Sequence, residues 1–136
     1  MTVHDKRFAK THDDILEAMA DALITCWDSK LHYFVWRPVM AIREGEYDDN
    51  PNTAGDPAWQ SLVNNPNYPD YTSGANSVIG AAMRTFALFY GRDDIAIEVT
   101  SNAPAAIKKT RKYPSFSAVA AQVVNARIYL GIHFRF

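Results

Sequence analysis

The sequence predicts an all-α protein, a single helical bundle spanning residues 1–136. Three stretches carry apolar residues at helical spacing, and a Ser or Thr that suits a helix N-cap precedes each of them. A chain of 136 residues has the size of one domain. With 48% apolar residues it can build a core, and about two-thirds of the extended-chain surface is expected to be buried at this size.

Composition excludes several classes of protein. A net charge of −1 gives no overall basic footprint, so no nucleic-acid partner is expected. Apolar runs are broken well before they could span a membrane, and the polar residues 1–14 show no signal peptide, which leaves the compartment open. Cys26 is the only cysteine and lies in an apolar helical stripe, which favours an inert core thiol over a reactive one.

The first helix is expected to begin at an N-cap, Thr11, after frayed residues 1–10, and to run to about Lys30. Its continuation to residue 36 stays open, because Pro38 either ends the helix or only kinks it. On a continuous helix, seven residues would return Lys30 and Arg37 to one face.

A long irregular loop is expected at about 44–72, which holds four Pro residues and many Asn and Asp. Such a loop in a small domain is usually functional or disordered. Its large apolar and aromatic residues favour a packed loop: Trp59, Leu62, Val63, Tyr68 and Tyr71.

The second helix should be capped by Ser73, run from about Gly74 to Tyr90 and end at Gly91. Ser73 and Gly74 would then lie at a helix N-terminus, where free N–H groups and the helix dipole favour anions.

Within residues 92–114, large apolar residues alternate with other residues over positions 95–99. This pattern fits either an extended piece or one helical turn. The basic residues that follow favour a solvated loop over substrate attraction: Lys108, Lys109, Arg111 and Lys112. Ser115 or Ser117 should cap the third helix, in which Arg127 borders the buried side and needs anionic or carbonyl partners. Gly131 should loosen the end of that helix before His133.

Three segments together supply positive charges, a hydroxyl, a backbone N–H and an imidazole. This inventory suits a tetrahedral oxyanion or a phosphate ester, because guanidinium and N–H groups match its oxygens and a neutral imidazole nitrogen can attack or ligate its centre. The candidate residues are Lys30, Arg37, Ser73, Gly74, Arg127 and His133.

The spacing of these segments resembles that of the superfamily of type 2 phosphatidic acid phosphatases, bacterial acid phosphatases and vanadium-dependent haloperoxidases. Its signature is K-x6-R-P, P-S-G-H and S-R-x5-H. Here the matching segments are Lys30-x6-Arg37-Pro38, Thr72-Ser73-Gly74-Ala75 and Ala126-Arg127-x5-His133. Surrounding residues, such as 36–43 and 68–74, look closer to the soluble haloperoxidase-like branch.

The resemblance implies an all-α bundle with the site between helices. It implies that His133 is either the nucleophile, forming a phosphohistidine, or the axial ligand of vanadate. The other five candidates would hold the equatorial oxygens. Vanadate would be the cofactor of a haloperoxidase, whereas a phosphatase needs none, and the sequence leaves this choice and the substrate open.

Two departures from the signature point to impaired activity. Ala75 replaces the second His, and losing a general acid typically costs about 10²–10⁴-fold in rate. Members of the family often have an Asp four residues after the nucleophilic His, a position past Phe136, so His133 is expected to lack a carboxylate partner. Phe134 and Phe136 would also need cover from the loop or another chain.

Three interpretations therefore stand. The first is a phosphatase-like or haloperoxidase-like enzyme impaired by Ala75. The second is a non-catalytic protein that binds an oxyanion. The third is a truncated structural paralogue, assembled as a homo-oligomer through its Phe-rich end.

Overall fold

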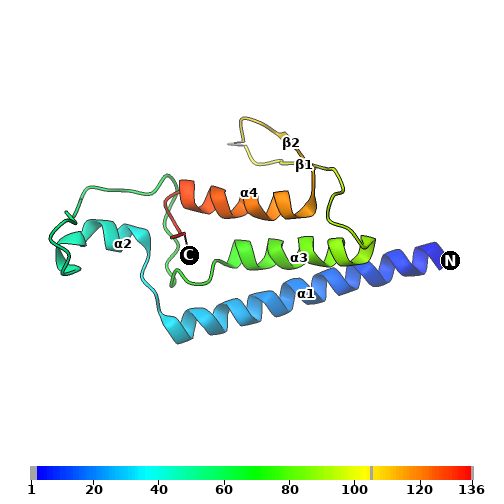
Figure 1. Cartoon of the computed structure of the whole chain (residues 1–136), viewed down its shortest axis with the longest axis horizontal. Helices are drawn as coiled ribbons and strands as arrows, with labels where there is room; N and C mark the ends of the chain where they lie inside the picture. Colours follow the sequence, from blue (N-terminus) through cyan, green and yellow to red (C-terminus); the bar gives the residue numbers. More distant parts are fainter. Residues whose placement is uncertain (1–2, 105, 136) are drawn as a thin grey trace.

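The computed structural model describes residues 3–104 and 106–135 and consists mainly of three stacked helices (Figure 1). These are α1 (Val3–Tyr33), α3 (Gly74–Tyr90) and α4 (Phe116–Tyr129). The middle helix, α3, packs against both of the others and runs antiparallel to them. The predicted all-α helical bundle is confirmed. The C-terminal ends of α1 and α4 and the N-terminal end of α3 consequently lie at one end of the molecule.

The first helix differs from the prediction at both ends. It begins at Val3, so the predicted N-cap at Thr11 is wrong, because no Gly or Pro interrupts the helix before this residue. It ends at Tyr33, and Phe34 follows in the left-handed region with φ 52°. Arg37 is then the extended N-cap of a separate short helix, α2 (Pro38–Arg43), with Pro38 at its first position. Lys30 and Arg37 therefore do not share a helix face.

The predicted bounds and caps of α3 are confirmed. The Ser73 Oγ accepts a hydrogen bond from the backbone N–H of Asn76, as an N-cap does. At the other end Gly91 adopts φ 70°, a left-handed conformation that glycine accepts without steric cost.

Two conformations were open for residues 95–99, and residues 97–99 belong to a strand. The strand β1 (Ile97–Thr100) pairs antiparallel with β2 (Thr110–Tyr113), and Ile97 lies opposite Tyr113. Two members of the basic cluster make local contacts only: Lys112 lies 3.6 Å from Glu98, and Lys109 donates to the carbonyl of Ala103. This agrees with a solvated surface.

The N-terminus of α4 is capped twice. Ser115, one of the two predicted caps, accepts a hydrogen bond from the N–H of Ala118. Ser117 instead donates its N–H and its hydroxyl to the two carboxylate oxygens of Asp93, at 2.9 and 2.5 Å. These bonds, the side-chain bond foremost, lower the pKa of Asp93.

Replacing Asp93 by alanine should lower the urea midpoint of unfolding at pH 7, because Ser117 loses its acceptor. A carboxylate whose pKa is depressed on folding contributes stability above its unfolded pKa of about 3.9, and that contribution is lost as the pH falls through the folded value. The difference in urea midpoint between Asp93→Ala and the parent should therefore become smaller below pH 4. Glu17→Ala, on the exposed surface of α1, serves as the control. A difference that stays constant with pH would contradict this account.

The loop at 44–72 is largely ordered by packing, as predicted. It begins with a single turn of 3-10 helix, Gly45–Tyr47. The Tyr68 ring packs against that of Trp27 in a tilted arrangement, and Tyr71 meets Tyr33 edge-on. Leu62 and Val63 were expected to pack as well, but they are exposed, and Leu62 anchors the loop through its backbone N–H to the carbonyl of Leu130.

Trp59 of this loop lies against the turn that follows α4. A Cβ at Gly131 would come within 2.8 Å of the Trp59 ring, and Gly131 also has φ 75°. Both the contact and the backbone conformation therefore require glycine, which ends α4 before His133.

The core is smaller than composition suggested. The accessible surface is 9678 Å², against about 7,100 Å² expected for a folded monomer of 15.3 kDa. Part of the exposed surface is apolar and lies on α1, where six described large side chains are exposed: Leu16, Leu23, Ile24, Trp27, Leu31 and Tyr33. None of the described helices combines the length and the hydropathy that crossing a bilayer requires.

Candidate functional site

The candidate residues gather at the end of the molecule where three helix ends meet (Figure 1). Lys30 lies in the last turn of α1, Ser73 caps the start of α3, and Arg127 lies in the last turn of α4. Between them runs the end of the long loop, residues 68–72. The antiparallel packing of α3 explains this convergence of segments that are far apart in the sequence.

Lys30 is almost completely buried, with 1% of its surface exposed. Its Nζ donates to the carbonyl oxygens of Pro69 and Asp70, at 2.7 and 2.9 Å, and lies over the Tyr68 ring. Burial lowers the pKa of Lys30, and the positive charges of Arg37 and Arg127 lower that pKa further.

Arg37 reaches the same loop from the other side. Its guanidinium donates to the carbonyls of Tyr68 and Ile132, at 2.9 and 2.6 Å. Its Nη1 also lies 3.3 Å from His133 Nε2. Burial is the main cause that lowers the pKa of Arg37. Lys30 and Arg37 thus both bind carbonyl oxygens of one loop. They do not share a helix face, which a continuous helix would have required.

Asp70 is a buried carboxylate in the middle of this cluster, with no exposed surface. Its Oδ1 lies 2.5 Å from His133 Nδ1 and 3.5 Å from Arg37 Nη1. Neither contact has the alignment of a hydrogen bond, so this oxygen has two close polar neighbours but no directed donor. Its Oδ2 accepts the backbone N–H of Phe134 at 3.4 Å.

His133 is buried between these two residues, 6% exposed. An arginine nitrogen is always a donor, so the 3.3 Å approach of Arg37 Nη1 favours a lone pair on His133 Nε2. The proton of a neutral ring would then sit on Nδ1, which faces Asp70. This tautomer presents Nε2 as an acceptor, ligand or nucleophile.

Arg127 is the candidate with the fewest partners. It is partly buried, and its Nε is fully enclosed without a hydrogen-bond acceptor among the described residues. An enclosed guanidinium nitrogen without a partner is costly. It is the group in the cluster that most clearly requires an anion or another acceptor.

Two cavities flank the cluster and divide the candidates between them. One of about 200 Å³ is lined by His133 and Ser73, together with Asn76 and Ser77. The other, an apolar groove of about 400 Å³ between α1 and α3, is lined by Lys30, Gly74 and Ala75. Arg37 borders a third cavity, with Trp36 and Tyr68. The candidates therefore surround one region but do not all face one cavity.

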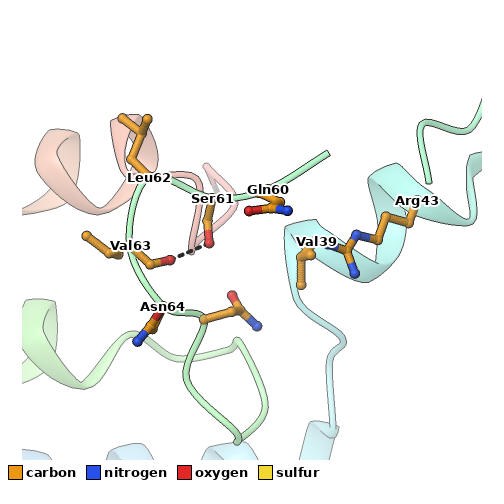
Figure 2. Close-up of a pocket in the computed structure, with 8 residues that line it drawn as sticks. Val39, Arg43, Gln60, Ser61, Leu62, Val63 and Asn64 are labelled. Atoms are coloured by element: carbon orange, nitrogen blue, oxygen red, sulfur yellow. Dashed lines mark hydrogen bonds between the residues drawn. The ribbon is translucent and has the colours of Figure 1, made fainter. Parts of the chain in front are cut away.

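A further polar cavity lies away from the cluster, between α2 and the stretch 60–65 of the loop (Figure 2). It has a volume of about 390 Å³ and is lined by residues such as Arg43, Gln60 and Asn64. Ser61 stabilises its wall by donating to the carbonyl of Val63 at 2.5 Å. None of the candidate residues lines it.

Asp70 is the residue that sequence reasoning missed. His133 was expected to lack its usual carboxylate partner, and the structure places another carboxylate, that of Asp70, against the ring from the loop. An Asp placed between two tyrosines, three residues before the helix cap Ser73, was the available signal. Phe134 is half-buried and borders the His133 cavity, whereas Phe136 lies outside the described residues.

The cluster has the composition of an anion site. Among the described residues, no group of three His, Cys, Asp or Glu side chains could hold a metal cation. Three cations around one imidazole suit an oxyanion instead.

Comparisons with known proteins identify relatives of this chain. Residues 15–136 match a family model described as the VCPO second helical-bundle domain. Vanadium chloroperoxidase of Curvularia inaequalis is 29% identical over 178 residues, an alignment that covers 98% of this chain and 29% of that protein.

Solved structures show the same fold. A bacterial vanadium-dependent iodoperoxidase superimposes with a TM-score of 0.80 at 29% identity, over 95% of this chain and 29% of its own. A bacterial vanadium-dependent chloroperoxidase in its holo form superimposes with a TM-score of 0.67 at 21% identity. The superposition covers 90% of this chain and 30% of that protein, and at this identity it supports the fold alone.

This chain thus spans less than a third of the length of the relatives that it matches. The family match covers nearly all of it, from residue 15 to residue 136. Together with the helical bundle, these matches show that the chain belongs to the superfamily of vanadium haloperoxidases and type 2 phosphatidic acid phosphatases, through the VCPO second helical-bundle domain.

Proposed function

We propose that this chain binds a tetrahedral oxyanion, vanadate or phosphate, between the ends of α1, α3 and α4. The observation that carries the proposal is the enclosed, unpartnered Nε of Arg127, close to the charges of Lys30 and Arg37. An anion placed among these groups would supply the missing acceptor and offset the repulsion between like charges.

The residues that would hold the anion are the six candidates. The cations Lys30, Arg37 and Arg127 would meet its oxygens, with Ser73 Oγ and the N–H of Gly74 at the N-terminus of α3. Lys30 and Arg37 now donate to loop carbonyls, so they would exchange some of these acceptors for the anion. His133 would face its centre through Nε2. Vanadate, when bound, supplies a Lewis-acidic centre for the oxidation of halides by peroxide.

The geometry also bears on turnover. Ala75 borders the groove that Lys30 and Gly74 line, and it offers no proton to a leaving group or to peroxide. We therefore expect an impaired haloperoxidase or phosphatase. A protein that binds the anion without turnover is the second candidate, because no acid is found at this position. Hydrolysis of an aryl phosphate, whose leaving group needs little protonation, and peroxide-dependent iodide oxidation would separate the two.

Replacing Arg127 by methionine is the direct test of this site. Titration of the parent with orthovanadate and with phosphate, followed by calorimetry, should give saturable binding. In Arg127→Met we expect binding to weaken by at least about 30-fold, since hydrogen bonds to charged groups contribute roughly 2 kcal/mol. The urea midpoint should stay the same or rise, because the substitution removes an unpartnered buried nitrogen.

Arg84→Met, on the exposed surface of α3, is the matched control and should bind as the parent does. Absence of vanadate and phosphate binding by the parent would overturn the proposed function. Equal affinities of the parent and Arg127→Met would remove Arg127 from the site.

A further inference from the structure

We infer that Asp70 is the positioning residue of the site: its carboxylate holds His133 in the tautomer and orientation that present Nε2 to the anion. The inference rests on the proposed function for its ligand, but its geometric part stands on this chain alone. Three observations carry it, namely the burial of Asp70, the anchoring of its backbone and the contacts of its two oxygens.

The first observation is that Asp70 is buried without any exposed surface. Burying a carboxylate costs several kcal/mol unless charged or hydrogen-bonding partners compensate it. A loop aspartate that served only solubility would lie at the surface, as Asp48 and Asp49 do. The position of Asp70 therefore calls for a specific role in the interior.

The second observation is that the backbone of Asp70 is fixed on both sides. Its N–H donates to the carbonyl of Val35 at 2.8 Å, and its carbonyl accepts Lys30 Nζ at 2.9 Å. The carboxylate is thus held by α1 and by the segment that follows α1, and not by the loop alone. A support fixed in this way can orient a neighbouring ring to within a few tenths of an ångström.

The third observation is that the two carboxylate oxygens of Asp70 contact different groups. Oδ1 faces His133 Nδ1 at 2.5 Å, and Oδ2 accepts the N–H of the next residue, Phe134. A small rotation of the imidazole would align Nδ1–H with Oδ1. On the other edge of the ring, Arg37 Nη1 approaches Nε2 at 3.3 Å as a donor. Both neighbours favour the same tautomer, with the proton on Nδ1.

The consequence is that a loop residue can act as the orienting carboxylate. The resemblance implies that an aspartate often orients the nucleophilic His, and here Asp70 of the loop contacts His133 Nδ1. Outer-shell carboxylates of this kind orient a ligating His and raise its basicity, and their loss typically costs about 10–100-fold in affinity.

The test combines a spectrum of the ring with a binding measurement. Nitrogen-15 correlation spectra of the histidines, recorded at pH 8 without ligand, should show His133 of the parent protonated on Nδ1. In Asp70→Ala the Nε2–H form should become populated, and the dissociation constant of orthovanadate should rise by about 10–100-fold. Asp70→Asn keeps the shape of the side chain and one acceptor oxygen but loses the charge. Its dissociation constant for orthovanadate should lie between those of the parent and of Asp70→Ala.

Asp13→Asn is the matched control, because Asp13 contacts His12 Nδ1 at 3.5 Å on the exposed surface. It should leave the His133 signals and the affinity unchanged. The inference would be overturned if Asp70→Ala and Asp70→Asn fold and show the same His133 nitrogen-15 signals and the same vanadate affinity as the parent. Failure of both variants to fold would overturn it as well. A parent that shows the Nδ1–H form but binds no vanadate would refute the proposed function instead.

Discussion

Replacing His133 by alanine should weaken the binding of orthovanadate by more than about a hundredfold. Loss of a residue that only orients a ligand costs about 10–100-fold, so loss of the ligand itself should exceed that range. His133 is the only imidazole in the cluster, and its Nε2 lies beside Arg37, where an anion would meet both. Calorimetry and vanadium-51 resonance of the titrated protein would measure the effect.

The matched control is His32→Ala. His32 lies near the end of α1, is exposed and meets Tyr33 edge-on, so it has the same chemistry as His133 without the burial. This variant should bind vanadate as the parent does. Unchanged affinity in a folded His133→Ala protein would show that the anion binds elsewhere. An equal loss of vanadate affinity in His32→Ala and His133→Ala would indicate a non-specific effect.

Replacing Arg37 by methionine should cost about 3–5 kcal/mol of stability, the range found when one member of a buried charged pair is removed. The variant loses three groups of contacts. The carbonyls of Tyr68 and Ile132 lose their donor, and Asp70 is left without its nearest guanidinium. Methionine has a similar length, so the loss reflects charge and hydrogen bonding more than volume. Urea unfolding followed by circular dichroism would measure it.

Arg43→Met is the control for this change. Arg43 lies in the last turn of α2 and donates to the carbonyl of Trp59, but it is exposed. Exposed substitutions usually change stability by less than about 0.5 kcal/mol. A similar, small change in both variants would mean that the contacts of Arg37 contribute little, and that loop 68–70 is held by other residues.

The contrast with Arg127 separates two kinds of buried arginine. Arg37 donates to the carbonyl oxygens of Tyr68, Pro69 and Ile132, and we expect its loss to affect folding first. Arg127 Nε has no acceptor among the described residues, and we expect its loss to affect binding first. Both residues belong to the same signature, so their different roles are visible only from their partners.

Much of the helical framework could be read from the sequence. The caps of α3, Ser73 and Gly91, were identified correctly, because capping depends on a few neighbouring residues. For α4 the sequence left Ser115 and Ser117 open, and Ser115 is the N-cap. The break before α2 was left open, since a proline can end a helix or only kink it. The hairpin of β1 and β2 was also undecided, because its strands are four residues long and mostly exposed.

The extent of the core could not be predicted from composition. Apolar content indicates how much surface a chain can bury, but not how much its helices cover. Here α1 contacts α3 and still leaves the side chains of Leu16, Ile24 and Leu31 exposed. Such exposed apolar side chains are typical of surfaces that associate with other protein elements.

The sequence by itself determined the inventory of the site: three cations, a helix N-terminus and one imidazole at the spacing of a known superfamily. It also determined the helices that carry Lys30, Ser73 and Arg127, because capping and periodicity are local properties. Only the tertiary structure decided that Asp70 lies against His133, that Arg37 donates to loop carbonyls and that Arg127 Nε finds no acceptor among the described residues. The physical reason is that partners of buried charges come from residues distant in sequence, and their approach depends on how the loop packs between the helix ends.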